Sequence, residues 1–150
     1  MANGRENVNE RDESQELAAL IVEQSPDAII FARNDGTIGL WNAAAEQIFG
    51  HTKAEALGQN LDLIIPERFR EAHWKAFDVA VEAGKTRLEG RAMPTRSMRK
   101  DGETIYVELS FGIVKDSEGT VIGALGNARD ITEKFLAERA KRQEQQQASA

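Results

Sequence analysis

The sequence contains no cysteine among its 150 residues. Disulfide bonds, thiolate metal sites and cysteine nucleophiles are therefore excluded together. The absence leaves the compartment undecided, because a missing residue type reports no redox condition. Other catalytic signatures are missing as well: there is no glycine-rich phosphate loop, no His-x-x-x-His metal pair, and no kinase or cyclase segment. We therefore expect a protein that is not an enzyme.

Long hydrophobic runs are absent too. No window approaches the ~20 consecutive apolar residues that a membrane-spanning helix requires, and the polar amino terminus has no apolar segment of the kind found in a secretory signal. The formal net charge of −6 argues against general affinity for nucleic acid, whose backbone attracts clustered cations. We expect a cytoplasmic protein that binds neither membrane nor nucleic acid, with an ordinary core from its 41% hydrophobic residues.

The first part of the chain predicts a helix and then a β-hairpin. Residues 1–12 are rich in Asn, Glu and Arg, and we expect a disordered segment. Apolar residues recur at helical spacing over 13–24, and Ser25-Pro26 ends that helix. Two short apolar runs lie on either side of an Asp-Gly turn, at residues 28–32 and 37–41.

The middle of the chain predicts a series of helices. They cover residues 43–49, 52–57, 61–65 and 67–83. Gly50 and Gly58 follow the first two, as expected of residues that end a helix with a positive φ angle. The apolar face of the longest helix carries Phe69, His73 and Phe77.

The last third predicts strands and a final helix. The strands cover residues 88–98, 105–113 and 121–129. The second of them alternates most regularly, and Pro94 marks the first as an edge or bulged strand. The segment 133–150 is charged and helical in pattern. Since strands and helices do not alternate regularly, the order predicts an α+β fold with an antiparallel sheet and helices on one side.

A set of motifs, in this order, resembles the PAS family over about residues 14–135. They are Ser25-Pro26-Asp27-Ala28-Ile29-Ile30, Trp41-Asn42-Ala43-Ala44-Ala45-Glu46-Gln47-Ile48-Phe49-Gly50, Leu57-Gly58-Gln59-Asn60, Arg99-Lys100-Asp101-Gly102, Gly119, and Arg129-Asp130-Ile131-Thr132-Glu133. The resemblance implies a five-stranded antiparallel sheet whose short helices enclose a ligand pocket. It places the PAS domain at 25–132, a flanking helix at 13–24 and a signalling helix or linker at 133–150. Asp130 and Thr132 match the family's junction between the last strand and the output helix.

His73 carries the most specific implication of this resemblance. PAS domains bind haem, flavin, small acids or nothing, so the fold alone does not define the ligand. The stretch from Ile64 to His73 is similar to the haem-binding PAS domain of a cyclic-dinucleotide phosphodiesterase, and oxygen-sensing histidine kinases also carry the proximal haem histidine on this helix. The resemblance implies haem b with His73 as the iron ligand, and a neutral imidazole suits iron. The alternatives are that His73 packs in the core or, with the helix rotated slightly, points to water, while His51 is expected in a surface loop.

Five further residues are implied by the gap-free overlay on these relatives. Met93 falls where oxygen-binding relatives place a distal arginine, and Arg91 falls where the phosphodiesterase has a methionine ligand. A methionine sulfur could ligate the iron, whereas an arginine could steady bound oxygen by a charge-assisted hydrogen bond. Leu88, Leu109 and Phe111 match apolar positions on the gas-binding side. For Met93 and the three apolar residues, simple core packing predicts the same burial.

The leading hypothesis is therefore a haem-based sensor of a diatomic gas (O2, CO or NO) or of redox state. Phe69 and Phe77 would complete its pocket. A second hypothesis is a cofactor-free module that dimerises through terminal helices, with contacts from Leu17, Leu20, Ile21, Phe135 and Leu136. A third is a flavin (FAD) redox sensor without a reactive thiol, for which Trp41 and Trp74 are aromatic candidates, although ordinary packing explains both.

Overall fold

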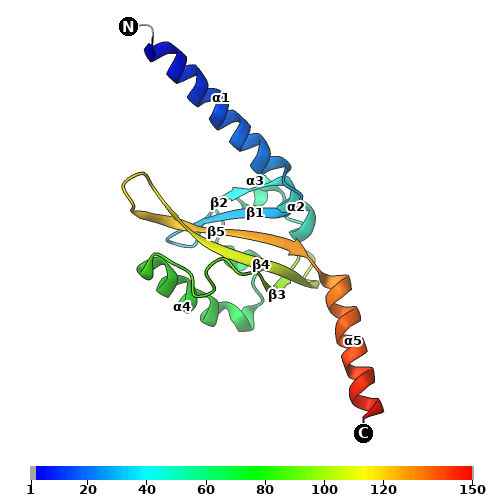
Figure 1. Cartoon of the computed structure of the whole chain (residues 1–150). Coiled ribbons are helices and arrows are strands. Elements are labelled where there is room, and N and C mark those ends of the chain that lie inside the picture. The colour runs from blue at the N-terminus through cyan, green and yellow to red at the C-terminus, as the bar shows by residue number, and fades with distance from the viewer. Residues whose placement is uncertain (1–2, 150) are drawn as a thin grey trace.

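The structure is a computed structural model that describes residues 3–149, with side chains from residue 9 onward (Figure 1). The elements in chain order are α1 (Asn3–Gln24), β1 (Ala28–Arg33), β2 (Ile38–Trp41), α2 (Ala43–Phe49), α3 (Lys53–Ala56), the 3-10 helix η1 (Leu61–Ile64), α4 (Glu67–Ala83), β3 (Met93–Met98), β4 (Thr104–Lys115), β5 (Val121–Asp130) and α5 (Thr132–Ala148). No helix in this described range combines the length and apolarity that a membrane crossing demands.

One antiparallel sheet of five strands forms the centre, in the order β2-β1-β5-β4-β3. The first and last strands of the domain, β1 and β5, are therefore neighbours, and both termini leave from the middle of the sheet. α4 crosses one face of the sheet, while α1 and α5 project away from the domain in opposite directions (Figure 1). The predicted five-stranded antiparallel sheet with flanking helices is confirmed.

The half of the domain built from β1, β2, α2 and α3 is filled by a small set of buried side chains. Trp41, Phe49 and Ile38 are each no more than 1% exposed, and the Trp41 and Phe49 rings lie 5.6 Å apart. Asn42 is also 1% exposed and caps α2, its Oδ1 accepting hydrogen bonds from the backbone N–H of Ala45 and of Ile29. Its Nδ2 donates to the carbonyls of residues 22 and 27. This network joins the end of α1 to the sheet.

The N-terminal helix differs from the sequence-based expectation. Residues 1–12 were expected to be disordered and the helix to cover 13–24, whereas α1 begins at Asn3. The segment is polar, but it has no proline, and its Glu and Arg residues are good helix formers. A polar composition therefore does not by itself prevent a helical backbone in the described part of this segment.

The strand predicted over 88–98 is shorter in the structure, where β3 covers only Met93–Met98. Before it, the chain turns through Glu89 and Gly90, which have φ angles of 49° and 80°. The Arg91 N–H donates to the Leu88 carbonyl and closes this turn. Two successive residues with positive φ interrupt an extended strand, so Leu88 and Arg91 lie outside the sheet.

Candidate functional site

A cavity of about 480 Å³ lies between α4 and the sheet. This volume falls within the roughly 300–1,000 Å³ of typical small-molecule pockets. Its lining is mostly apolar and comes from the sheet, α4 and η1. The lining residues are Ile30, Ala32, Phe49, Leu61, Ile64, Ile65, Phe69, Ala72, His73, Phe77, Pro94, Thr95, Arg96, Ser97, Val107, Leu109, Phe111, Ala124, Gly126 and Ala128.

The floor of the cavity is formed by small residues on the central strands. Ala124, Gly126 and Ala128 alternate along β5 and all line the cavity, as does Ala32 on the neighbouring β1. A Cβ atom added at Gly126 would come within 3.6 Å of Leu109, an ordinary contact distance. Because these side chains are short, the sheet presents a flat apolar surface on which a planar ligand could lie.

His73 lies on the opposite wall, within an aromatic cluster. Its ring centroid is 4.7 Å from Trp74, 6.1 Å from Phe77 and 6.5 Å from Phe111. Phe77 is buried, and Trp74 is fixed by a 2.6 Å hydrogen bond from its Nε1 to an Asp62 carboxylate oxygen. The cluster therefore holds the imidazole against the cavity.

The Nδ1 atom of His73 is buried and has no hydrogen-bond partner among the described residues. Burial lowers the pKa of His73 below the ordinary value of 6.5, against a smaller opposing effect of the Asp62 carboxylate. The imidazole is therefore neutral at pH 7, the form that can bind a metal. A neutral, half-buried imidazole on a cavity wall, facing a flat apolar floor, fits the requirements of a haem ligand.

Four other predicted site residues line the same cavity. Phe69 and Phe77 come from α4, while Leu109 and Phe111 come from β4. These four residues and His73 all lie in segments where apolar residues recur at regular helical or strand spacing in the sequence. The structure thus brings together five of the eight residues expected to contact a cofactor.

Met93, Arg91 and Leu88 do not line the cavity. Arg91 precedes β3 and is exposed, so it does not project beside Met93 from one regular strand as expected. Met93 pairs with Leu109 and thus shares its face of the sheet, but it sits at the open end of β3 and is 48% exposed. The turn before β3 is the physical reason why Arg91 lies outside the predicted strand and why Met93 is exposed at its end.

Three lining residues of β3 were not singled out from the sequence. Thr95 and Ser97 point to the cavity by strand alternation, and the Ser97 hydroxyl donates to the Ile64 carbonyl at 2.7 Å. Arg96 also contributes to the lining; it pairs with Tyr106 of β4, and its guanidinium carbon is 5.5 Å from the Tyr106 ring and 5.9 Å from the Phe69 ring. The only sequence signal was the run of polar residues after Pro94, which an edge strand also explains.

The second histidine is not at the surface. His51 is 8% exposed, its Nε2 is buried without a partner among the described residues, and its carbonyl accepts a hydrogen bond from the indole of Trp41. Its ring does not line the cavity. The expectation of a surface loop was wrong because the fold closes α2 and the β3–β4 turn over this residue, as the hydrogen bond from the Lys100 N–H to the Phe49 carbonyl shows.

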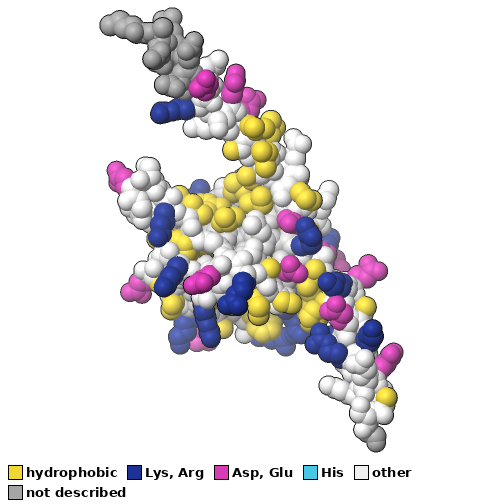
Figure 2. All heavy atoms as spheres, viewed as in Figure 1, with side chains coloured by type: hydrophobic (Ala, Val, Ile, Leu, Met, Phe, Trp, Pro, Cys, Tyr) yellow, Lys and Arg dark blue, Asp and Glu magenta, His cyan; other side chains and the backbone are white. Residues whose placement is uncertain are grey.

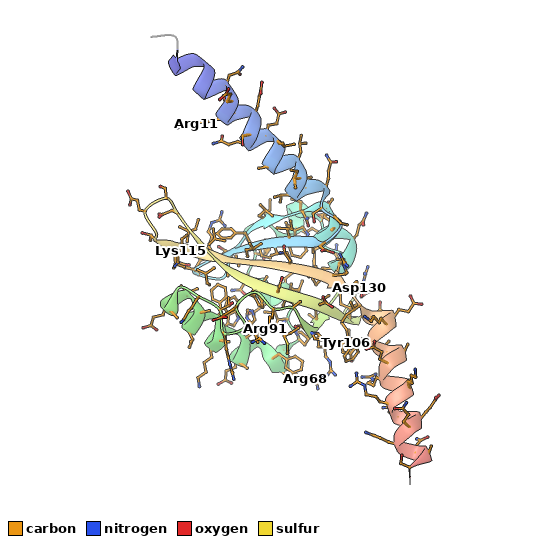
Figure 3. The ribbon with its side chains drawn as sticks, viewed as in Figure 1. Arg11, Arg68, Arg91, Tyr106, Lys115 and Asp130 are labelled. Atoms are coloured by element: carbon orange, nitrogen blue, oxygen red, sulfur yellow. The ribbon has the colours of Figure 1, made fainter. Side chains whose placement is uncertain are left out.

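The junction between β5 and α5 is held by several side chains. An Asp130 carboxylate oxygen accepts hydrogen bonds from the N–H and the hydroxyl of Thr132, at 2.9 and 2.6 Å. The Thr132 hydroxyl oxygen in turn accepts from the Tyr106 N–H. The Tyr106 ring stacks on Phe135 with centroids 4.0 Å apart, and its hydroxyl accepts from Arg139 (Figure 3). The predicted junction residues thus join α5 to β4 as well as to β5.

Comparisons with known proteins agree with this geometry. The chain is 30% identical over 100 residues to the oxygen sensor protein DosP of Escherichia coli, and 31% identical over 113 residues to the sensor protein FixL of Bradyrhizobium diazoefficiens. These alignments cover 67% and 75% of this chain but only 12% and 22% of the two relatives. The chain therefore corresponds to one part of each relative.

Solved structures share the fold. A PAS domain from Colwellia psychrerythraea matches with a TM-score of 0.69 and 28% identity, over 79% of this chain and 98% of that one. An RNA-binding light-oxygen-voltage receptor matches with a TM-score of 0.68 over 91% of this chain and 37% of that one, but its 22% identity indicates the fold alone. The model of the PAS fold matches residues 16–131. On this evidence of sequence, sheet topology and cavity, the chain belongs to the PAS family.

Proposed function

We propose that this chain is a haem-based sensor domain in which His73 holds the iron. The observation that carries the proposal is the neutral imidazole on the cavity wall, whose buried Nδ1 has no partner among the described residues. The similarity to an oxygen sensor protein and to FixL supports it. Haem in this cavity would supply an iron that can take up a diatomic gas or change its oxidation state.

The protein's own part is to hold and enclose the flat cofactor. The floor of Ala124, Gly126 and Ala128 leaves room for a planar ring, and the aromatic cluster around His73 would limit the access of water to an iron held by this imidazole. Leu109 and Phe111 crowd the same cavity from β4. Apolar side chains of this kind restrict the space for a ligand without offering it a hydrogen bond.

Strand β4 connects the cavity to the output helix. Val107 lines the cavity, while the preceding Tyr106 points to the other face and stacks on Phe135 of α5. A ligand that displaces Val107 or Leu109 would therefore shift the Tyr106 contact with α5. The hydrogen bonds of Asp130 and Thr132 hold the start of this helix and would carry the displacement into it.

An absorption spectrum of the purified protein after titration with haem tests the proposal. We expect one equivalent to bind with an intense Soret band, and His73→Ala to change the spectrum and weaken retention. His51→Ala is the matched control, because His51 is buried outside the cavity. Met93→Leu is expected to leave the ferrous spectrum unchanged, since Met93 is outside the cavity lining.

The same spectrum separates the rival functions. Retained flavin absorption instead of a Soret band would favour the FAD redox sensor, and no chromophore after titration would favour a cofactor-free interaction module. If haem binds and His73→Ala has the spectrum of the unaltered protein, His73 is not the iron ligand. Loss of folding in the variant is checked by its far-ultraviolet circular dichroism.

We also propose that two copies of the chain pair through α1. Leu17, Leu20 and Ile21 are 58%, 48% and 61% exposed and lie at the i, i+3 and i+4 positions of one helix face. Figure 2 shows this apolar group at the base of the projecting helix, above the domain. Leu136 of α5 is 40% exposed and could extend the contact. Phe135, also expected at the interface, instead stacks on Tyr106 of its own chain.

Sedimentation or light scattering tests this pairing. We expect a dimer that dissociates when Leu17 and Ile21 are both replaced by Glu. The control is Leu57→Glu, which changes an equally apolar, 40% exposed residue elsewhere in the domain. A monomeric unaltered protein, or a dimer that survives the double change, would overturn the proposal.

A further inference from the structure

We propose that Arg96 is a positioning residue that couples the wall of the cavity to the output helix α5. Its guanidinium carbon is 5.9 Å from the Phe69 ring of α4 and 5.5 Å from the Tyr106 ring of β4. Phe69 lines the cavity, whereas Tyr106 stacks on Phe135 of α5. One side chain therefore lies between a residue that a ligand can touch and a residue that holds the output helix. The inference rests on the proposed function for its sensing site, but not on the identity of the cofactor.

The position of Arg96 in the sheet explains how it contacts both rings. It pairs directly with Tyr106 of β4, and directly opposite residues of an antiparallel pair point to the same face of the sheet. Tyr106 is turned away from the cavity, because the neighbouring Val107 lines it. β3 lies at the edge of the sheet. At an open edge, the long side chain of Arg96 can also contact Phe69 of α4, the helix that covers the opposite face.

The guanidinium of Arg96 is held by these aromatic faces rather than by an acid. Within residues 9–149, the ion pairs are those of Lys53, Lys100 and Arg129, so no carboxylate pairs with Arg96. Arg96 is half-buried. A cation is attracted to the electron-rich face of an aromatic ring, and the attraction grows where water is excluded. A displacement of either ring therefore changes where the guanidinium lies relative to the other ring.

Tyr106 provides the contact surface for the start of α5. It is 8% exposed, its ring lies 4.0 Å from the Phe135 ring at an angle of 19°, and its hydroxyl accepts a hydrogen bond from Arg139 at 3.2 Å. Its backbone carbonyl accepts from the N–H of Ile131, just before the helix. Figure 3 shows Tyr106 at the point where β4 meets α5. A change at this ring is therefore felt in the first turns of the helix.

Phe69, Arg96 and Tyr106 thus form a relay of side chains that runs beside the strand route through Val107. α4 contributes both Phe69 and His73 to the cavity wall, so a ligand held by His73 would also change how Phe69 lies. In the relay, side chains carry this change from α4 to Tyr106, whereas the strand route requires β4 itself to move. Loss of Arg96 should therefore weaken transmission to α5 without removing the cavity.

Hydrogen–deuterium exchange of the α5 amides tests the relay by a double-mutant cycle, in the full chain without ligand. Phe69→Leu removes the aromatic face but keeps an apolar side chain on the cavity wall. It should raise the exchange rate at residues 135–139 by about threefold, as expected when a cation–π contact is lost. Arg96→Gln should raise the rate by about threefold too, and Phe69→Leu should have no further effect in that variant. Arg96→Lys should keep part of the coupling, because an ammonium group also attracts an aromatic face.

Arg68→Gln is the matched control. The guanidinium carbon of Arg68 is 4.7 Å from the same Phe69 ring, but Arg68 is exposed and, among the described residues, its guanidinium meets no second ring. In this variant, Phe69→Leu should still raise the exchange rate in α5 by about threefold. The amides of α2, in the other half of the domain, serve as the reference. A general loss of stability or of folding raises their exchange as well, whereas loss of the relay changes α5 alone.

A second set of measurements repeats the exchange experiment with saturating haem. We expect haem to change the exchange rate at residues 135–139 by about threefold or more in the unaltered protein, and by clearly less in Arg96→Gln. An equal response to haem in the two proteins would overturn the relay, because β4 alone would then transmit the change. Independent effects of Phe69→Leu and Arg96→Gln, or no effect of Phe69→Leu on α5, would overturn it even where haem binds with a Soret band. Coupling between Phe69 and Arg96 in a protein that binds no haem would support the relay and overturn the haem assignment.

Discussion

Trp41 and Trp74 belong to two halves of this domain, and their surroundings differ. Trp41 is 1% exposed, packs against Phe49 and donates its indole N–H to the His51 carbonyl. Trp74 is only half-buried; its ring lies over Gly36, and its N–H reaches Asp62. The half around Trp41 is filled, whereas the half under α4 contains the cavity. One half of the domain stabilises the fold and the other leaves room for a ligand.

The difference has a physical cause in the side chains that the two halves supply. In the filled half, Trp41 of β2 and Phe49 of α2 are each 1% exposed, and their rings lie 5.6 Å apart. In the other half, Ala124, Gly126 and Ala128 of β5 face α4, of which only Phe77 is buried. Side chains that line a cavity pack against fewer protein atoms than side chains in a filled core. The filled half must therefore provide much of the stability that the cavity lacks.

The largest expected effect on the free energy of unfolding comes from replacing each of the two tryptophans by alanine. Trp41→Ala should lower the free energy of unfolding by roughly 3–5 kcal/mol, since it creates a large cavity and leaves a buried carbonyl without its donor. Trp74→Ala should cost about half as much, because its ring is already partly exposed. Urea unfolding followed by circular dichroism measures both. Equal losses in the two variants would contradict the division into a filled and a hollow half.

Two glycines in β5 allow a second comparison, in which the expected changes in the free energy of unfolding are smaller. A Cβ atom at Gly123 would lie 2.2 Å from the Ala32 carbonyl oxygen, whereas at Gly126 the nearest atom is 3.6 Å away. Gly123→Ala should therefore destabilise the domain by about 2–3 kcal/mol through overpacking. Gly126→Ala should change stability by less than about 0.5 kcal/mol, and it should weaken porphyrin binding because it raises the cavity floor. A large stability loss at Gly126 would mean that this floor is already tightly packed.

The smallest expected effect is on the pH dependence of stability. Burial is the main cause that lowers the pKa of both His51 and His73 below 6.5; Lys100 adds to it at His51, while Glu55 opposes it there and Asp62 opposes it at His73. As pH falls, the unfolded chain takes up these protons first. Each histidine thus contributes stability that is complete above 6.5 and is lost as pH falls through its lowered folded value.

The urea midpoint of the unaltered protein should therefore decrease between about pH 7.5 and about pH 5. This decrease should be smaller in His51→Gln and in His73→Gln, each compared with its own value at the higher pH. With haem bound, the contribution of His73 should change and that of His51 should not. Identical pH profiles for the unaltered protein and both variants would show that neither imidazole is buried in its neutral form.

Regular patterns in the sequence predicted much of the fold. The helical pattern of Phe69, His73 and Phe77 and the alternation in β4 predicted the apolar face of each element, and the resemblance to haem-binding relatives then assigned Leu109 and Phe111 to the cavity that these faces line. These predictions succeeded because the apolar period of a helix or strand determines which face is buried. The resemblance to the PAS family supplied the single five-stranded sheet and the pocket enclosed by short helices, which no local pattern contains.

Other parts of the site depended on irregular backbone and on distant contacts. The positive φ angles at Glu89 and Gly90 displaced Leu88 and Arg91 from the predicted strand, and Met93 became exposed at its end. His51 became buried through packing between segments that are far apart in the sequence. A short turn or a long-range contact has little signal in a single sequence, so these errors occurred where the periodic patterns ended.

The sequence by itself determined the absence of thiol chemistry, the α+β order of elements, and the helix face that carries His73. Only the tertiary structure decided that small residues of β5 leave a cavity opposite this histidine, and that the guanidinium groups of Arg96 and Arg68 both lie near the Phe69 ring. The reason is that periodicity specifies which side of an element is apolar. Cavity shape and the meeting of charges depend on how separate elements pack, which the order of residues along the chain does not express locally.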